Sequence, residues 1–137
     1  MAEIIALVYN KDRVGVCIDT AHTFAAGYDL RSAEAYQETM SQLDKIVGLK
    51  YVLAFHCNDS KAECVPLLLL WVLALLKPTY SLGTHRDLHE NIGMGHLGLR
   101  AFANLVSDER LDDLPFILET PMLDVSLNSG CIICIGF

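Results

Sequence analysis

The sequence predicts an α/β fold in which parallel strands alternate with helices, as they do in a (β/α) barrel. Three short apolar runs carry this prediction, and each ends on a polar residue that can bind a metal: Val14–Asp19, Tyr51–His56 and Pro115–Glu119. Runs that are apolar throughout are typical of strands buried on both faces, so the sheet should be parallel. Amphipathic segments between the runs supply the crossover helices that parallel strands require.

The segment between the first two runs predicts a helix over Ser32–Val47. Ser32 can cap its start, and Gly48 follows its end. Its apolar stripe consists of Tyr36, Met40, Leu43 and Val47. A second helix is predicted before the third run, with an apolar stripe of Leu99, Phe102, Ala103 and Val106.

Parallel strands joined by crossover helices place all their carboxyl ends on one side, and in barrels that side carries the chemistry. Asp19, His56 and Glu119 should therefore converge there. Two further short segments add polar residues close to these strand ends. The candidate metal ligands are Asp19, His22, His56, Asp87, His89 and Glu119.

Imidazole combined with carboxylate suits zinc, manganese or iron better than magnesium or calcium, and zinc is the preferred assignment. Taken singly, a His or Asp after a strand is more often a helix cap, a turn former or a satisfied polar group. The presence of such residues at three convergent strand ends and one loop favours a metal site. Metal ions held by such a cluster commonly bind phosphate oxygens and activate a water molecule.

Four blocks of sequence resemble the endonuclease IV family of abasic-site endonucleases, in the order of that family. They are GVCIDTAHTFAAGYDLR (Gly15–Arg31), FHCNDSK (Phe55–Lys61), GTHRDLHENIGMG (Gly83–Gly95) and ILETP (Ile117–Pro121). The resemblance implies a xylose isomerase-like TIM barrel with three zinc ions. It also implies a DNA repair hydrolase of base excision repair, which cleaves the phosphodiester bond 5′ to an abasic site in double-stranded DNA.

By the same resemblance, Asp19, His56 and Glu119 would hold one zinc, and His22, Asp87 and His89 another. The three predicted strands match about the last three of the eight barrel strands. The strands without a counterpart carry the two histidines of the remaining zinc and a glutamate that bridges two ions. At most two partial zinc sites are therefore expected, in a chain that is inactive by itself.

The resemblance divides the chain into two parts. Residues 1–121 match the C-terminal part of the barrel, interrupted at residues 64–81 by an insertion that has no counterpart in the family. Residues 122–137 form a tail without resemblance. The apolar stretch Val65–Leu76 in the insertion is shorter than the roughly 17 to 25 residues that cross a bilayer, so no membrane partner is expected.

The composition limits the class of protein. With 53% hydrophobic and 20% charged residues the chain should be globular, and an odd count of five cysteines favours a reducing compartment. The net charge of −7 is opposite in sign to the positive charge that favours nucleic-acid binding, although bound zinc ions would place positive charge next to a phosphate.

The resemblance implies a nuclear or mitochondrial location in a eukaryote and a cytoplasmic one otherwise. It also implies a monomer when the barrel is complete.

Two alternatives remain open. A metal-dependent sugar isomerase on a related barrel also gathers His, Asp and Glu at strand ends, but it gives no reason for the block HRDLHENIG. A non-catalytic truncated fragment would leave both edges of its sheet unpaired and prone to association. Nucleophilic catalysis by Cys17 or Ser60 is disfavoured because the spacing supplies no general base, and Lys61 and Arg86 are expected to be solvated charges.

Overall fold

The computed structural model describes residues 1–61, 89–120 and 133–135. The helices are α1 (Ala2–Leu7), α2 (Thr20–Ala25), α3 (Ala33–Ile46) and α5 (Gly98–Val106), with 3₁₀ turns at Lys11–Arg13, Leu49–Tyr51 and Glu109–Leu111. The strands are β1 (Val16–Asp19), β2 (Val52–His56), β3 (Asp59–Ser60), β4 (His89–Glu90), β5 (Phe116–Leu118) and β6 (Ile133–Ile135). The three predicted strands are thus present, each slightly shorter than its apolar run.

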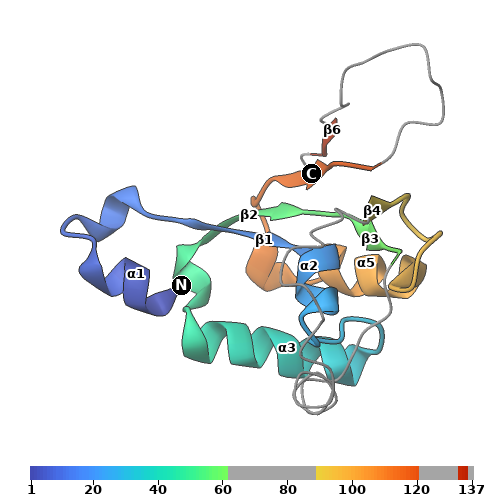
Figure 1. Ribbon diagram of the computed structural model, residues 1–137, viewed down its shortest axis with the longest axis horizontal. Helices are drawn as coiled ribbons and strands as arrows, with labels where there is room; N and C mark the ends of the chain where they lie inside the picture. Colours follow the sequence, from blue (N-terminus) through green and yellow to red (C-terminus); the bar gives the residue numbers. More distant parts are fainter. Residues whose placement is uncertain (62–88, 121–132, 136–137) are drawn as a thin grey trace, which may run out of the picture.

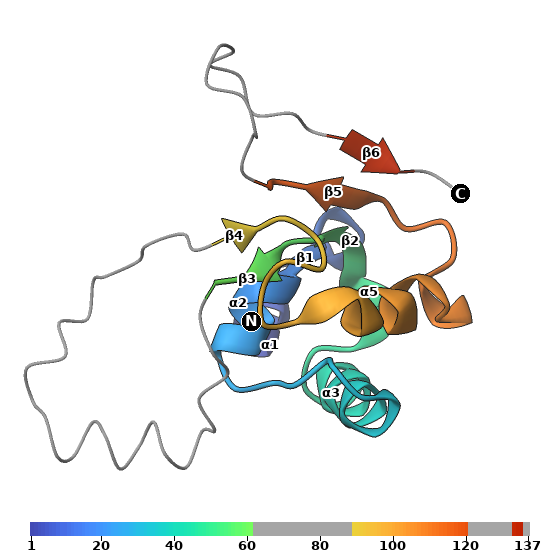
Figure 2. The same cartoon turned by 90° about the vertical axis from the view of Figure 1, so that its right-hand side faces the viewer.

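The main sheet has the order β1-β2-β5-β6, and its first three strands are parallel as predicted. Ile18 pairs with Phe55, which pairs in turn with Phe116. The α/β class is confirmed, and the described strands form an open sheet, which is part of a barrel and not a closed one. Figure 2 shows the strands stacked above the helices, with β6 outermost.

Strand β6 departs from the prediction of a wholly parallel sheet. It pairs antiparallel with β5, with Ile133 opposite Leu118. The outer edge of β5 is therefore paired, contrary to the expectation of two open edges. An unpaired edge presents a row of N–H and C=O groups that an extended neighbouring segment can satisfy, which accounts for the added strand.

The expectation that the strands are buried on both faces is wrong for the described residues. Helices α2, α3 and α5 all cover the same face of the sheet (Figure 1). On that face Phe24, Tyr36 and Phe55 are at most 2% exposed. On the other face Cys17 is exposed and Leu53 is 56% exposed. A barrel strand buries its inner face against strands across the barrel, so three parallel strands leave that face uncovered.

Helix α3 forms as the sequence predicts. The Ser32 hydroxyl accepts a hydrogen bond from the Ala35 main-chain N–H at 3.1 Å, which caps the first turn. Gly48 follows the helix with a φ of 93°, a conformation that favours glycine. Tyr36 and Met40, on the predicted stripe, are each 2% exposed.

Helix α5 is present, but its predicted apolar face is wrong. Leu99 is 67% and Val106 53% exposed, whereas the buried residues of this helix are Ala101, Phe102 and Leu105. The sequence GLRAFANLV is apolar on most sides, so two overlapping stripes compete and periodicity alone does not choose between them.

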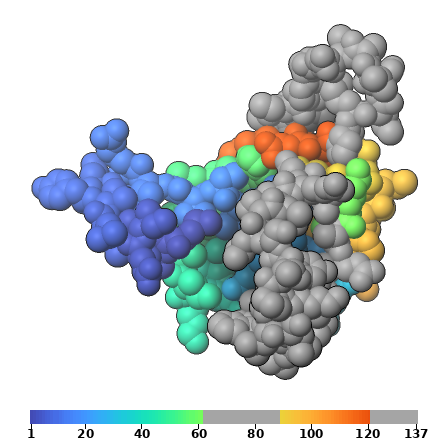
Figure 3. All heavy atoms as spheres, in the orientation of Figure 1, coloured from blue at the N-terminus to red at the C-terminus, as the bar shows by residue number. Residues whose placement is uncertain are grey.

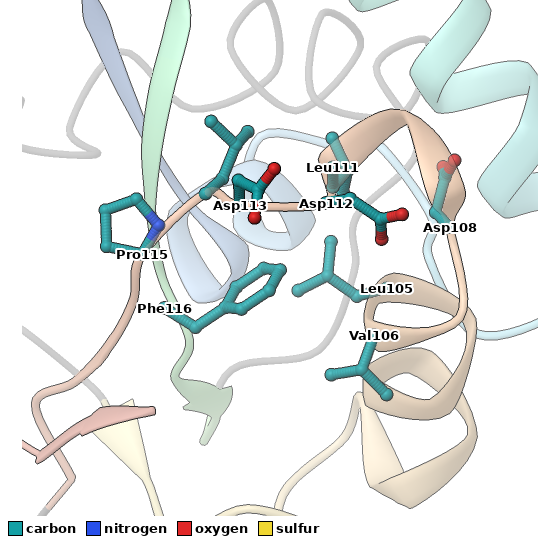
Figure 4. Close-up of a pocket in the computed structure, with 9 residues that line it drawn as sticks. Leu105, Val106, Asp108, Leu111, Asp112, Asp113, Pro115 and Phe116 are labelled. Atoms are coloured by element: carbon teal, nitrogen blue, oxygen red, sulfur yellow. The ribbon is translucent and has the colours of Figure 1, made fainter. Parts of the chain in front are cut away.

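A cavity of about 520 Å³ lies at the amino end of β5. Figure 4 shows Leu105, Leu111 and Phe116 around it, with Asp108 and Asp112 from the preceding turn. The cavity and the predicted metal ligands are thus at opposite ends of the parallel strands.

The N-terminal segment that carries α1 lies at one side of the molecule (Figure 3). Ile4, Leu7 and Tyr9 in this segment are each at least 66% exposed. The Lys11 ammonium group caps the end of α1 by donating to the carbonyl oxygens of Ile5 and Ala6 in the helix and of Val8 just after it, at 2.9 to 3.1 Å. Among the described residues, no helix has the length and apolar character that crossing a bilayer would take.

Candidate metal centre

The carboxyl ends of β1, β2 and β5 bring three of the predicted ligands together. Asp19 and His56 are register partners in neighbouring strands, and Glu119 directly follows β5. His56 Nδ1 lies 2.8 Å from Glu119 Oε2 and 3.9 Å from Asp19 Oδ2. One ligand atom from each of the three side chains lies within 4.8 Å of the others, a spacing at which one ion could contact all of them.

A second group forms where β3 and β4 pair. Ser60 is the partner of His89 in this short antiparallel ladder. The centroid of the His89 ring lies 5.4 Å from that of the His22 ring, and His89 Nε2 lies 3.5 Å from Asp19 Oδ2. Asp19, His22 and His89 therefore form a second set of possible ligands within 4.8 Å of one another. The two sets share Asp19.

Asp19 combines the roles of helix cap and candidate ligand on different oxygens. Its Oδ1 accepts the main-chain N–H of His22 at 2.9 Å and caps α2. Its Oδ2 faces the two histidines, His56 and His89. The capping bond fixes the rotation of the carboxylate and so aims Oδ2 at the cluster.

The sixth predicted ligand, Asp87, lies outside the described residues, as do the whole predicted insertion and most of the predicted tail. The described geometry groups His22 and His89 with Asp19, whereas the resemblance groups them with Asp87. Which carboxylate completes that group, and whether the cluster holds a metal, stay predictions. Arg86 also lies outside the described residues.

Asn58 is a central residue to which the sequence assigned no role. It is fully buried, and its side-chain Nδ2 donates to Asp19 Oδ2 at 2.9 Å. Its Oδ1 accepts the main-chain N–H of Glu119 at 2.8 Å. Asn58 thus bonds to residues at the carboxyl ends of β1 and β5. Two sequence signals could have revealed it: it lies two residues after the polar end of β2, and it belongs to the matched block FHCNDSK.

His89 has a defined orientation in the same network. Its Nδ1 lies 3.3 Å from the Glu119 carbonyl oxygen, to which a protonated Nδ1 donates. That tautomer leaves the lone pair of Nε2 directed toward Asp19 and Asn58. A hydrogen bond from one imidazole nitrogen commonly orients the other toward a metal.

Asp59 is the second residue without a predicted role. Its carboxylate is fully buried and accepts five main-chain N–H groups at 2.7 to 3.2 Å. The donors are Ser60, Gly93, Gly95, Leu97 and Gly98. The bonds from the three glycines hold the loop before α5 against this carboxylate. A Cβ added at Gly95 would lie 2.5 Å from Asp59 Oδ1, so a side chain there would collide with the carboxylate.

Two cysteines lie close to the cluster. Partial burial of the sulfur, together with the charges of Asp19 and Glu119, raises the pKa of the Cys17 thiol although the residue as a whole is exposed. Burial also raises the pKa of Cys57 to about 12. Both thiols are therefore protonated at neutral pH, which disfavours them as nucleophiles or metal ligands.

Lys61 lies at the surface beside an acidic residue. Its side chain is 47% exposed, and its ammonium nitrogen lies 3.6 Å from a carboxylate oxygen of Glu90. This agrees with the interpretation of Lys61 as a solvated surface charge.

The donor set fits zinc. Each group combines imidazole nitrogen with carboxylate oxygen, which zinc accepts, whereas magnesium and calcium favour oxygen alone. His22 is exposed and His89 is buried, so the second group reaches from the interior to the solvent.

The chain is similar in sequence to proteins of known family. A family model described as a xylose isomerase-like TIM barrel matches residues 1–129. A probable endonuclease 4 of Campylobacter concisus is 43% identical over 120 residues, covering 88% of this chain and 36% of that protein. Apurinic-apyrimidinic endonuclease 1 of Schizosaccharomyces pombe is 45% identical over 120 residues, covering 88% of this chain and 30% of that protein. The chain thus spans about a third of the length of these relatives.

The solved structure of endonuclease IV from Thermus thermophilus is also similar. Its TM-score is 0.62 and its sequence identity 32%, with 88% of this chain and 36% of that chain covered. The described strands and helices therefore resemble part of a complete enzyme of this kind.

Proposed function

Since the chain belongs to the xylose isomerase-like TIM barrel family and resembles endonuclease IV over most of its length, we propose that it carries part of the zinc centre of an abasic-site DNA endonuclease. The single observation that carries the proposal is the convergence of Asp19, His56 and Glu119 at three parallel strand ends. Of the alternative roles for such residues, helix capping accounts for Asp19 Oδ1, and polar contacts within the protein account for Asp19 Oδ2 with Asn58 and for His56 with Glu119. None of these roles requires the three side chains to converge.

Asp19, His56 and Glu119 would hold one zinc ion, and His22 and His89 would contribute to a second. Zinc bound there would supply Lewis-acid chemistry, by lowering the pKa of a water and offsetting negative charge on a phosphodiester. The chain's own residues orient the ligands. Asp19 Oδ2 is aimed by the bond that Oδ1 receives from His22, and His89 Nε2 by the contact of Nδ1 with the Glu119 carbonyl.

The charge of the cluster also supports a cation. Carboxylate oxygens of Asp19 and Glu119 lie within 4.8 Å of one another, and like charges at this spacing repel. The His56 imidazole between them offsets this repulsion only when it is protonated. A divalent ion would offset it over the whole pH range in which the carboxylates are ionised.

The described residues supply five of the proposed ligands, which is fewer than three zinc ions need. We therefore propose double-stranded DNA with abasic sites as the substrate of a complete barrel that contains this segment, and little activity for the segment itself. The net charge of −7 does not provide the positive surface that DNA binding favours, which is consistent with contacts made by other parts of such a barrel.

A chimeric enzyme tests the proposal. The part of Thermus thermophilus endonuclease IV that aligns with this chain would be replaced by this chain, and the chimera assayed for nicking of an abasic duplex with zinc present. Nicking is expected, and His56→Ala should abolish it. An intact duplex serves as the substrate control.

A folded, zinc-loaded chimera that leaves abasic DNA uncut while its parent cuts it would contradict the proposal. An aldose–ketose interconversion assay on the same chimera would then examine the sugar isomerase alternative.

A further inference from the structure

Asn58 lies at the point where the three segments of the candidate centre meet. The residue comes two positions after His56, the last residue of β2, and is 0% exposed. The amide contacts Asp19 on one side and the main chain of Glu119 on the other. Its Nδ2 also lies 3.5 Å from His89 Nε2.

The two partners determine the orientation of this amide. The Asp19 carboxylate can only accept a hydrogen bond, so it must face the NH₂ group. The Glu119 N–H can only donate, so it must face the carbonyl oxygen. Neither an ionised carboxylate nor an apolar side chain at position 58 could satisfy both.

Thr20 fixes the main chain of Asn58 as well. The Thr20 hydroxyl accepts the Asn58 N–H at 2.8 Å and donates to the Asn58 carbonyl oxygen at 2.7 Å. Thr20 is the first residue of α2 and follows Asp19 directly. The Asn58 side chain therefore starts from a backbone held to the same turn as one of its partners.

We infer that Asn58 is a positioning residue that holds Asp19 and Glu119 at the spacing an ion needs before the ion binds. This inference rests on the proposed function. The Asn58 amide keeps both acidic residues in place, so less ordering is needed when an ion arrives. Partners of this kind commonly change metal affinity by about 10-fold to 100-fold.

Paired substitutions in the full chain test this. Asn58→Ala should weaken zinc binding by about 10-fold to 100-fold in competition with a chromophoric chelator. It should also change the absorption spectrum of bound cobalt, which reports the arrangement of ligands. Asn104→Ala is the matched control, because the Asn104 amide, in α5, donates to the Leu30 carbonyl at 3.3 Å, away from the cluster. Unchanged zinc affinity and cobalt spectrum in a folded Asn58→Ala variant would overturn the inference.

A second measurement needs no substitution. In the unsubstituted chain labelled with ¹⁵N, zinc should shift the side-chain NH₂ signals of Asn58 and slow hydrogen exchange at the Glu119 N–H. The Asn104 NH₂ signals should stay in place. Zinc binding that leaves the Asn58 and Glu119 signals unmoved would overturn the inference but not the proposed function. Failure of the unsubstituted chain to bind zinc would overturn both.

Discussion

His56 Nδ1 lies 2.8 Å from Glu119 Oε2, although the two residues belong to different strands and distant parts of the sequence. Without an ion the two groups can share a hydrogen bond. With an ion both would turn their lone pairs to it, so the metal and a proton compete for the same site.

The first prediction concerns these ligands. His56→Ala should weaken zinc binding by more than about 100-fold, since loss of a direct ligand should cost more than the 10-fold to 100-fold typical of a supporting residue. His96→Ala is the control, because His96 is exposed and its described hydrogen bond is made by the main chain. Chelator competition measures both. Equal zinc affinity in the two variants would remove His56 from the centre.

The second prediction concerns the purified chain itself, which should bind zinc without nicking abasic DNA at the rate of its relatives. Five described ligands make at most two incomplete sites, and activation of a water depends on a full set of ligands and their partners. A duplex with one abasic site, incubated with the chain and zinc, measures this. Nicking at a rate like that of endonuclease IV, lost in His56→Ala, would show that the segment suffices.

The third prediction concerns Asp59. Asp59→Asn should reduce the free energy of unfolding by about 3 kcal/mol or more, because an NH₂ group would then face N–H groups that now donate to a carboxylate. Asp12→Asn, at an exposed position, should change it by less than about 0.5 kcal/mol. Urea unfolding followed by circular dichroism compares them. A stable Asp59→Asn protein would mean that the loop before α5 does not depend on this charge.

The fourth prediction tests the orientation of α5. Phe102→Ala should cost about 3–5 kcal/mol, whereas Leu99→Ala should cost less than about 0.5 kcal/mol. Phe102 is 8% exposed and Leu99 is 67% exposed. The stripe predicted from the sequence would make both substitutions costly. Denaturant unfolding of the two variants decides between the two faces.

The fifth prediction concerns pH. Partial burial opposes ionisation of Asp108, but hydrogen bonds from Arg110 and Tyr36 outweigh it and lower the pKa of its carboxyl below the ordinary value. A lowered pKa in the folded state contributes stability above the unfolded pKa of about 3.9, and this contribution is lost as the pH falls through the folded value.

The free energy of unfolding should therefore fall more steeply below about pH 4 in the unsubstituted protein than in Asp108→Asn. Thermal unfolding of the two proteins between about pH 2 and pH 6, a range that brackets the ordinary Asp pKa of about 3.9, measures this difference in pH dependence. Parallel curves for the two proteins would show that the Asp108 interactions do not favour its charged form.

The sequence was sufficient for features that depend on neighbouring residues. Helix α3 could be predicted with its cap at Ser32 and its end at Gly48, because caps and turns depend on local main-chain groups. The convergence of Asp19, His56 and Glu119 could also be predicted, since parallel strands place their carboxyl ends together. The resemblance to endonuclease IV rested on the same short blocks.

Only the tertiary structure decided which residues those ligands contact. Asp19 is shared by both groups of ligands, and Asn58 and Asp59 bond to loops distant in the sequence. These relationships follow from packing among several segments. Helix α5 illustrates the same limit, because its sequence allows two apolar faces. Its start is held where Leu97 and Gly98 donate to the buried Asp59 carboxylate, and the helix buries Ala101 and Leu105 together with Phe102, which both apolar faces share. Periodicity records which faces a helix could bury, whereas long-range hydrogen bonds and packing determine which one it does bury.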